Sequence, residues 1–268
     1  MDIQLINGLP GHLPLDNRGL AYGDGVFETI LLKNGRLQFL DQHLNRLLAG
    51  VLRLDLAWTA TQQSELINDL KKHTDSVQDV HVVKIMLTRK AVGRGYAFNH
   101  SEQSVDCIIQ IKPYTRPAWV MEGAIVQVAT IFASENKSLA GLKHLNRLDS
   151  VLARASIPDA NVNEVLMQTS KGLLVEGSMS NVFLLNGENW ETPNIKDAGV
   201  AGIIRAELLT EFSDIKVCDI SLSSIEGIKA GFITNSLIGI APIVSLNGKT
   251  LNHHPDIFRF SDRLSLTC

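Results

Sequence analysis

The chain has 268 residues, of which 45% are hydrophobic and 20% are charged, and its formal net charge at pH 7 is −3. This balance is typical of a globular protein with one large or two smaller domains, and it excludes a fibrous or a disordered chain. The small negative charge predicts no electrostatic footprint for nucleic acid.

The cysteines and the first residues of the chain bear on its compartment. The three cysteines are odd in number and far apart, which favours neither a disulfide framework nor a zinc cluster. Residues 1–8 lack the basic and apolar regions of a signal peptide, and no apolar run approaches the roughly 20 residues that span a bilayer. We therefore expect a cytoplasmic protein with no metal site and no membrane segment.

The N-terminal part begins with the pattern of two hairpins. Ile3–Ile6 is followed by the pair Asn7-Gly8, and the strands predicted over Val26–Lys33 and Arg36–Phe39 are joined by Asn34-Gly35. Asn-Gly pairs supply the positive φ angles that tight hairpin turns need. The pattern therefore predicts antiparallel strands on either side of each pair.

Two helices are predicted after these strands. Residues 40–54 combine one apolar face with Asp41 at the expected N-cap. The apolar face consists of Leu44, Leu47, Leu48, Val51 and Leu52. A second helix is expected over Thr61–His73, and β-rich runs follow at Val80–Thr88 and Val105–Ile111.

Residues 113–119 interrupt the periodic patterns and predict a linker. Pro113 and Pro117 remove backbone donors and disfavour helix on their N-terminal sides. We therefore expect an N-terminal α+β domain over residues 1–112 and a larger C-terminal domain over residues 120–268.

The C-terminal part mixes strands and helices without a regular βαβ repeat, which favours an α+β fold over a doubly wound parallel sheet. The predicted strands are 124–130, 164–168, 173–175, 182–185 and 231–234. The predicted helices are 144–156, 202–212 and 223–229. The first of these helices is expected to bury an apolar face made of Leu145, Leu148, Val151, Leu152 and Ala155.

Two residues of the C-terminal part point to one kind of chemistry. Lys143 stands where the chain enters the predicted helix 144–156, and Glu176 ends a predicted strand beside Gly177. An amine can form a Schiff base and a carboxylate can hold a protonated pyridine nitrogen, the two protein groups that pyridoxal phosphate (PLP) chemistry needs. Considered alone, each residue is better explained as an exposed side chain of a loop or a turn.

Further residues are suited to hold a phosphate group. Gly199–Arg205 places two glycines at a helix start, where backbone N–H groups and the helix dipole favour an anion. Arg46 offers a guanidinium, and Asn235 and Ser236 offer short polar donors after the strand 231–234. Each has a plain structural alternative, a turn or a surface arginine. Their occurrence in order with the lysine and the glutamate indicates a PLP site.

Six ordered blocks of the sequence resemble the fold-type IV PLP enzymes, the family of branched-chain and D-amino-acid aminotransferases and aminodeoxychorismate lyase. The blocks are Arg18–Thr29, His43–Leu47, the surroundings of Lys143, Glu176–Phe183, Gly199–Arg205 and Thr234–Pro242. They extend over nearly the whole chain. The resemblance implies a two-domain α+β fold, with a smaller N-terminal α/β domain and a larger PLP-binding C-terminal domain that has a β-barrel-like core.

The resemblance also implies which residues bind the cofactor. Lys143 would attach PLP as a Schiff base, and Glu176 would pair with its ring nitrogen. The phosphate would be held by Arg46, the backbone of Ile203 and Ile204, and Asn235 or Ser236. In aminotransferase relatives a threonine often stands where Ile204 stands here, so a hydroxyl contact is lost while the backbone donors stay.

Two runs, Lys143–Leu148 and Gly93–Tyr96, look more like the lyase members of the family, which release 4-aminobenzoate and pyruvate on the route to folate. In such an enzyme Lys143 would remove the C4 proton of 4-amino-4-deoxychorismate, and Thr29 is a candidate for passing a proton to the departing enolpyruvate. Thr29 fits a plain β-branched strand residue at least as well.

The loop that contains Arg94 and Tyr96 has two implied roles. Both residues are candidates to meet substrate carboxylates. In aminotransferase relatives this loop reaches a neighbouring subunit's site, so the resemblance implies a homodimer.

Two other functions stay open at this point. An aminotransferase acting on D- or branched-chain amino acids would use the same lysine and glutamate. A PLP-binding protein without turnover is the second alternative, because a fold does not dictate an activity.

Overall fold

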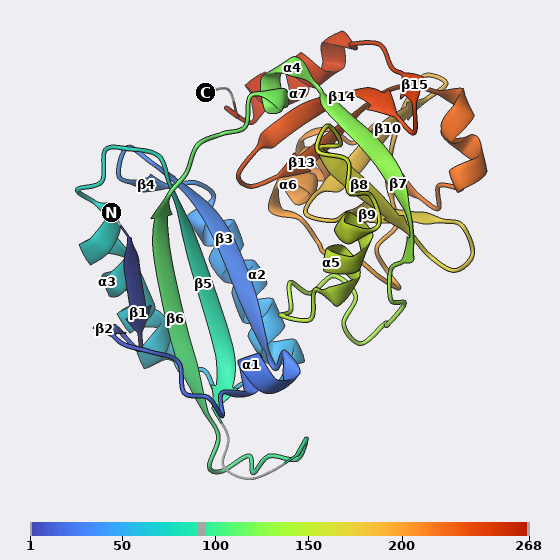
Figure 1. Cartoon of the computed structure of the whole chain (residues 1–268). Coiled ribbons are helices and arrows are strands. Elements are labelled where there is room, and N and C mark those ends of the chain that lie inside the picture. The colour runs from blue at the N-terminus through green and yellow to red at the C-terminus, as the bar shows by residue number, and fades with distance from the viewer. Residues whose placement is uncertain (1, 91–94, 267–268) are drawn as a thin grey trace. The chain divides into compact units, whose positions relative to one another are not determined.

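A computed structural model describes residues 2–90 and 95–266 (Figure 1). By its internal contacts the chain divides into two compact units. The first comprises Met1–Thr115 and Leu142–Asn146, and the second comprises Arg116–Gly141 and Arg147–Cys268. The domain limits expected from the sequence, with a linker at 113–119, stay a prediction. In the described part no helix combines the length and apolar character that a membrane crossing requires.

The first unit contains a six-stranded antiparallel sheet in the order β2-β1-β6-β5-β3-β4. Its strands are β1 (Ile3–Ile6), β2 (Leu9–Pro10), β3 (Gly25–Lys33), β4 (Arg36–Leu37), β5 (His81–Lys90) and β6 (Ser104–Pro113). The two Asn-Gly pairs form the tight turns, since Asn7 and Asn34 both have φ 50°. Both predicted hairpins are thus confirmed.

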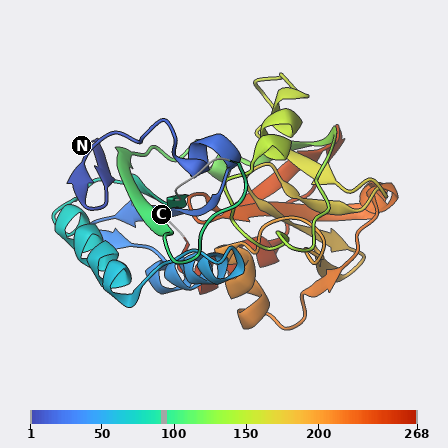
Figure 2. The ribbon, with the colours of Figure 1, turned by 90° about the horizontal axis from the view of Figure 1, so that it is seen from below.

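Two helices cover one face of this sheet, α2 (Leu40–Arg53) and α3 (Ala60–Thr74) (Figure 2). A short helix, α1 (Arg18–Tyr22), precedes β3. Helix α2 packs tightly on β3, because a Cβ added at Gly50 would lie 2.7 Å from the Val26 side chain. Two details of the prediction were wrong: Leu52 is exposed, and the N-cap of α2 is Phe39 with φ 53°, whereas Asp41 lies in the first turn.

The second unit is built on a nine-stranded mixed sheet that curls into a half-barrel. Its hydrogen-bonded order is β12-β11-β10-β13-β14-β7-β8-β9, with β15 beside β14. The strands are β7 (Ala124–Phe132), β8 (Glu164–Gln168), β9 (Leu174–Gly177), β10 (Asn181–Asn186), β11 (Asn189–Pro193), β12 (Lys216–Cys218), β13 (Ile228–Asn235), β14 (Gly239–Leu246) and β15 (Lys249–Thr250). Pairs β7–β14, β7–β8 and β11–β12 are parallel.

The described part of the second unit contains four α-helices. They are α4 (Trp119–Glu122), α5 (Leu148–Ala155), α6 (Ile203–Glu211) and α7 (Pro255–Arg263). Helix α7 contributes Phe260, which packs edge-on to Trp190 and at 5.7 Å from the ring of Phe232. Phe232 in turn stacks on Phe183 at 4.7 Å. These rings form an aromatic part of the core between β10, β11, β13 and α7.

The predicted helix 144–156 was wrong at its start and on its buried face. Residues 142–146 are extended and lie along β3, with a bridge between Val26 and His144, so α5 begins only at Leu148. Its apolar side chains face outward: Leu148 is 73% exposed and Leu152 is 53% exposed, while Ala153 is buried. Of the helix predicted over 223–229, residues 223–227 lie in a 3₁₀ helix, η1 (Leu222–Gly227), whereas residues 228 and 229 begin β13.

Candidate functional site

Lys143 is positioned by backbone pairing with β3. Its carbonyl accepts a hydrogen bond from Phe27 N at 2.9 Å, and Leu145 N donates to Gly25 O at 3.0 Å. The segment thus extends the sheet of the first unit beside the start of β3. The Lys143 amine lies 4.3 Å from the centroid of the Phe27 ring. The side chain is therefore half-buried against an aromatic face.

Arg46 points from α2 to a buried carboxylate on β3. Its Nε donates to Glu28 Oε1 at 2.7 Å and its Nη2 donates to Glu28 Oε2 at 2.5 Å. His43 Nδ1 lies 2.6 Å from the same Oε2. Glu28 is 1% exposed and His43 is 0% exposed. The sequence predicted Arg46 as a phosphate ligand but not this partnership.

The pKa values of this cluster shift for identifiable reasons. Burial raises the pKa of Glu28, but hydrogen bonds and charges from Arg46 and His43 outweigh it, so the net shift is downward. The pKa of His43 is lowered, by burial first, with the charges of Arg46 and Lys143 acting in the same direction. Glu28 is accordingly ionised at pH 7 and His43 neutral, with the Nδ1 proton donated to the carboxylate.

Thr29 lies one residue beyond Glu28, on the opposite face of β3. It shares that face with Phe27 and stands opposite Lys84 on β5. The Lys84 amine lies 5.2 Å from the Phe27 ring centroid, so this ring contacts two lysines. Thr29 is thus on the sheet face that presents the Phe27 ring.

Arg18 holds the end of the loop predicted to meet substrate carboxylates. Its Nη1 donates to Gly95 O at 2.9 Å and its Nη2 donates to Tyr96 O at 3.1 Å, while its Nε donates to Asp24 at 2.9 Å. The Tyr96 ring lies 5.3 Å from that of Tyr22 and is largely exposed. Arg94, the other candidate in this loop, lies outside the described residues.

Glu176, in the second unit, is buried where β9 ends. Its Oε2 accepts a hydrogen bond from Val200 N at 2.8 Å and lies 3.5 Å from Asn181 Nδ2. Gly199 has φ 89°, and a Cβ there would come within 3.4 Å of the Glu176 carboxyl carbon. The glycine lets the backbone approach close enough for Val200 N to fix the carboxylate. A carboxylate held in this way is suited to pair with a protonated ring nitrogen.

The N-terminus of α6 lies next to the same asparagine. The N-cap is Gly202, which has no side chain to cap the helix, so the first N–H groups of Ile203 and Ile204 have no side-chain cap. Asn181 Nδ2 donates to Val200 O at 3.1 Å, and a Cβ on Gly202 would lie 1.9 Å from Asn181 Oδ1. Asn181 therefore links the carboxylate to the helix N-terminus, an arrangement suited to a ligand with a basic ring nitrogen and a phosphate.

Asn235 is the last residue of β13, and Ser236 lies in the turn that leads to β14. The Asn235 carbonyl oxygen accepts from Leu237 N and Ile238 N, both at 2.9 Å, and its amide donates to Met179 O at 3.0 Å. The side chain of Asn235 therefore shapes this turn and ties it to the loop that follows Glu176.

Comparison with known proteins identifies the family. The profile of the amino-transferase class IV family matches residues 25–246. The chain belongs to this family. A relative named aminodeoxychorismate lyase, from Vibrio harveyi, is 30% identical over 90% of both chains. A putative branched-chain-amino-acid aminotransferase from Methanocaldococcus jannaschii is 26% identical, over 88% of this chain and 83% of its own length.

The solved structures support the same family. The 4-amino-4-deoxychorismate lyase of Pseudomonas aeruginosa superposes with a TM-score of 0.88, at 32% identity over 98% of each chain. The branched-chain amino acid aminotransferase of Escherichia coli, at 18% identity, covers 97% of this chain and 92% of its own with a TM-score of 0.84, which shows the fold alone. The predicted fold-type IV architecture is confirmed, and enzymes of this family depend on PLP.

Two charged residues near the class IV motifs were missed by the sequence analysis. Glu164 is fully buried at the start of β8, where its carboxylate accepts from the backbone of Ser178 and Met179 and from the Ser180 hydroxyl at 2.6 Å. It thus holds the loop between Glu176 and Asn181. The signal was available: a glutamate that opens an apolar strand run is a buried carboxylate in need of donors.

Arg205, on the first turn of α6, is the second missed residue. It is 8% exposed, and its Nη2 donates to Pro193 O at 3.0 Å. Its Nε has no hydrogen-bond partner in the described part of the chain. Burial lowers the pKa of this guanidinium, and the charge of Glu176 opposes the shift. Arg205 therefore brings a positive charge into the surroundings of Glu176.

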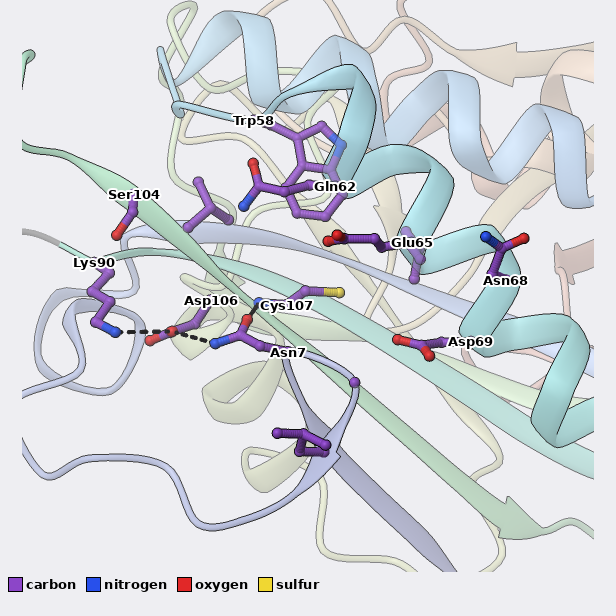
Figure 3. A pocket seen from close by; sticks show the side chains of 14 residues that line it. Asn7, Trp58, Gln62, Glu65, Asn68, Asp69, Lys90, Ser104, Asp106 and Cys107 are labelled. Atoms are coloured by element: carbon purple, nitrogen blue, oxygen red, sulfur yellow. Dashed lines mark hydrogen bonds and ion pairs between the residues drawn. The ribbon is translucent and has the colours of Figure 1, made fainter.

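The first unit also contains a pocket of about 520 Å³ that lies apart from the candidate site residues described above (Figure 3). It lies between the β1–β2 turn, α3 and β6, and Figure 3 shows Lys90 and Asn7 directed at Asp106 from opposite sides. Asn7 donates to Asp106 at 3.1 Å and Lys90 lies at 3.9 Å. None of the predicted site residues that the structure describes lines it.

Proposed function

We propose that this class IV enzyme is a PLP-dependent lyase that converts 4-amino-4-deoxychorismate into 4-aminobenzoate and pyruvate, a step of folate biosynthesis. The supporting observation is that a relative at 30% identity and a solved structure at 32% identity, each matched over at least 90% of this chain, are both named for this lyase activity. A cytoplasmic location and a homodimer, expected from the sequence, are part of the proposal.

The residues of the second unit fit PLP. Glu176 would hold the protonated ring nitrogen, because Val200 N fixes its carboxylate. Ile203 and Ile204 would offer N–H groups to the phosphate at a helix start that no side chain caps. Asn235 or Ser236 would add further polar groups, and Arg46, a residue of the first unit, is proposed to add a guanidinium.

Lys143 is the proposed catalytic lysine. When bound, PLP supplies a ring that stabilises negative charge on the substrate carbon next to the amine. Lys143 would hold the cofactor through its amine and take the proton from C4 of the substrate. The amine lies 4.3 Å from the centroid of the Phe27 ring, so one side of it is covered by an aromatic face.

The other proposed residues act on the leaving group and the carboxylates. Loss of the C4 proton together with the enolpyruvyl group leaves an aromatic ring, and the enolpyruvate becomes pyruvate when it gains a proton. Thr29 is proposed to pass that proton. Arg94 and Tyr96 are proposed to bind substrate carboxylates.

An aminotransferase is the second candidate, because relatives at 24–27% identity are named D-alanine aminotransferase. An amino donor distinguishes the two. Stoichiometric conversion of the cofactor to its amine form by D-alanine or a branched-chain amino acid, without an aromatic product from aminodeoxychorismate, would favour the aminotransferase.

The decisive experiment mixes the purified protein with PLP and 4-amino-4-deoxychorismate. We expect equal amounts of 4-aminobenzoate and pyruvate, and no product from Lys143→Ala. Borohydride reduction followed by peptide mapping should place the cofactor label on Lys143. If the PLP-loaded wild type forms no aromatic product, the lyase proposal fails.

A further inference from the structure

Glu28 forms the centre of a buried polar cluster, and neither it nor His43 has a role in the proposed reaction. It lies on β3 beneath α2, and both of its neighbours, His43 and Arg46, come from one turn of that helix. Glu28 and His43 are 1% and 0% exposed. A buried carboxylate is costly unless it is fully hydrogen-bonded, so this arrangement calls for a specific role.

The carboxylate binds Arg46 along one edge of the guanidinium. Oε1 accepts from Nε at 2.7 Å and Oε2 accepts from Nη2 at 2.5 Å, which is a bidentate contact. Two parallel hydrogen bonds fix the plane of a guanidinium as well as its position. The two hydrogen bonds therefore also fix the direction in which Nη1 of Arg46 points.

His43 fixes the carboxylate in turn. Its Nδ1–H donates to Oε2 at 2.6 Å, so this oxygen accepts one hydrogen bond from His43 and one from Arg46. His43 Nε2 is buried without a hydrogen-bond partner in the described part of the chain. The imidazole therefore has a single polar contact there, and that contact is with Glu28.

We infer that Glu28 and His43 are positioning residues that orient Arg46 toward the phosphate of the cofactor. The inference rests on the proposed function, in which Arg46 is a phosphate ligand. Charge alone does not explain the cluster, because the negative carboxylate reduces the attraction of the guanidinium for a phosphate. The cluster instead contributes orientation. Because Glu28 already holds one edge of the Arg46 guanidinium, Arg46 can bind the phosphate without a further loss of side-chain entropy.

The test compares binding of PLP with binding of pyridoxal, which lacks the phosphate. Cofactor-free protein is titrated with each compound, and the ratio of the two Kd values measures recognition of the phosphate. Glu28→Asp keeps the charge but withdraws the carboxylate by one methylene, so it cannot contact both edge nitrogens of Arg46 and His43 together. We expect the preference for PLP to fall by roughly tenfold, the size of one charge-assisted hydrogen bond.

Matched variants separate positioning from general loosening of the fold. The Nδ2 of an asparagine occupies the place of the histidine Nδ1, so His43→Asn should keep the preference and His43→Leu should lower it. Arg46→Lys should lower it as well, and adding Glu28→Asp to Arg46→Lys should cause no further loss. A structural role alone would weaken binding of both compounds equally and leave the ratio unchanged.

The outcomes distinguish this inference from the proposed function. If the wild type binds PLP no better than pyridoxal, the assignment of Arg46 as a phosphate ligand fails, and the inference fails with it. If the wild type prefers PLP and Glu28→Asp keeps that preference within twofold, the inference alone is overturned.

Discussion

Gly202→Ala tests how Asn181 links Glu176 to the start of α6. A Cβ at position 202 would lie 1.9 Å from Asn181 Oδ1, whereas real Cβ atoms essentially never approach closer than 3.0 Å. The added methyl group and Asn181 Oδ1 must therefore move apart by at least about 1.1 Å. The obstacle is a buried side chain that is 5% exposed and donates to Val200 O at 3.1 Å, so it has little room to move.

The expected cost follows from the hydrogen bond that is broken. Displacement of Asn181 leaves its amide and the Val200 carbonyl buried without their partner, and each unsatisfied group costs about 1–3 kcal/mol. For the two groups together we expect the free energy of unfolding to fall by about 2–6 kcal/mol, which corresponds to a decrease in Tm of roughly 5–20 °C for a chain of this size. Thermal and urea unfolding followed by circular dichroism measure both quantities.

Two controls make this prediction specific. Gly227→Ala adds the same methyl group where no atom lies within 4 Å, so it should leave the Tm nearly unchanged. In an Asn181→Ala background the Oδ1 atom is gone, and Gly202→Ala should cost less than about 1 kcal/mol. An unchanged Tm for Gly202→Ala, or an equal loss in both backgrounds, would refute the reasoning.

Three further predictions concern other buried charges. Glu164→Gln removes a carboxylate that accepts hydrogen bonds from Ser178 N at 3.0 Å and from neighbouring donors. It should lower the free energy of unfolding by about 2–4 kcal/mol, measured by urea titration, and a loss below about 0.5 kcal/mol would contradict this prediction. The pKa of Glu28 is lowered in the folded state from 4.5, so the unfolded chain takes up its proton first as the pH falls. The stability advantage of wild type over Glu28→Gln should therefore be complete above about pH 5 and shrink below pH 4.5, and a difference independent of pH would contradict this. The lysine of Arg18→Lys cannot donate to Gly95 O and Tyr96 O from one planar group, so hydrogen exchange at the Tyr96 amide should become faster. The KM for the substrate should also rise by a larger factor than kcat falls. An unchanged exchange rate would argue against the hydrogen bonds from Arg18 to this loop.

The sequence predicted local structure well where the signal is local. Asn-Gly pairs set both hairpin turns, and the leucine spacing located α2 to within one residue at its C-terminal end. It failed at Leu148–Ala155, because apolar periodicity marks a helix face without showing whether that face is covered. The extended course of residues 142–146 depends on pairing with β3, more than a hundred positions away, which no local pattern encodes.

The candidate site was also predictable only in part. The chemistry of Lys143 and Glu176 follows from residue types within ordered motifs. The groups that hold the site residues in place could not be predicted, because Glu176 is fixed by a backbone N–H twenty-four positions away and Arg46 by a carboxylate on another element. Such partners depend on tertiary packing.

The assignment of Leu142–Asn146 to the first unit means that the polypeptide passes between the two units three times, after Thr115, Gly141 and Asn146. A fragment that ends at Thr115 would thus leave the flank of Gly25–Phe27 without the strand that pairs with it. The two halves are consequently unsuited to separate expression by a simple cut. Dissection would require grafting residues 142–146 onto the N-terminal piece through a new loop.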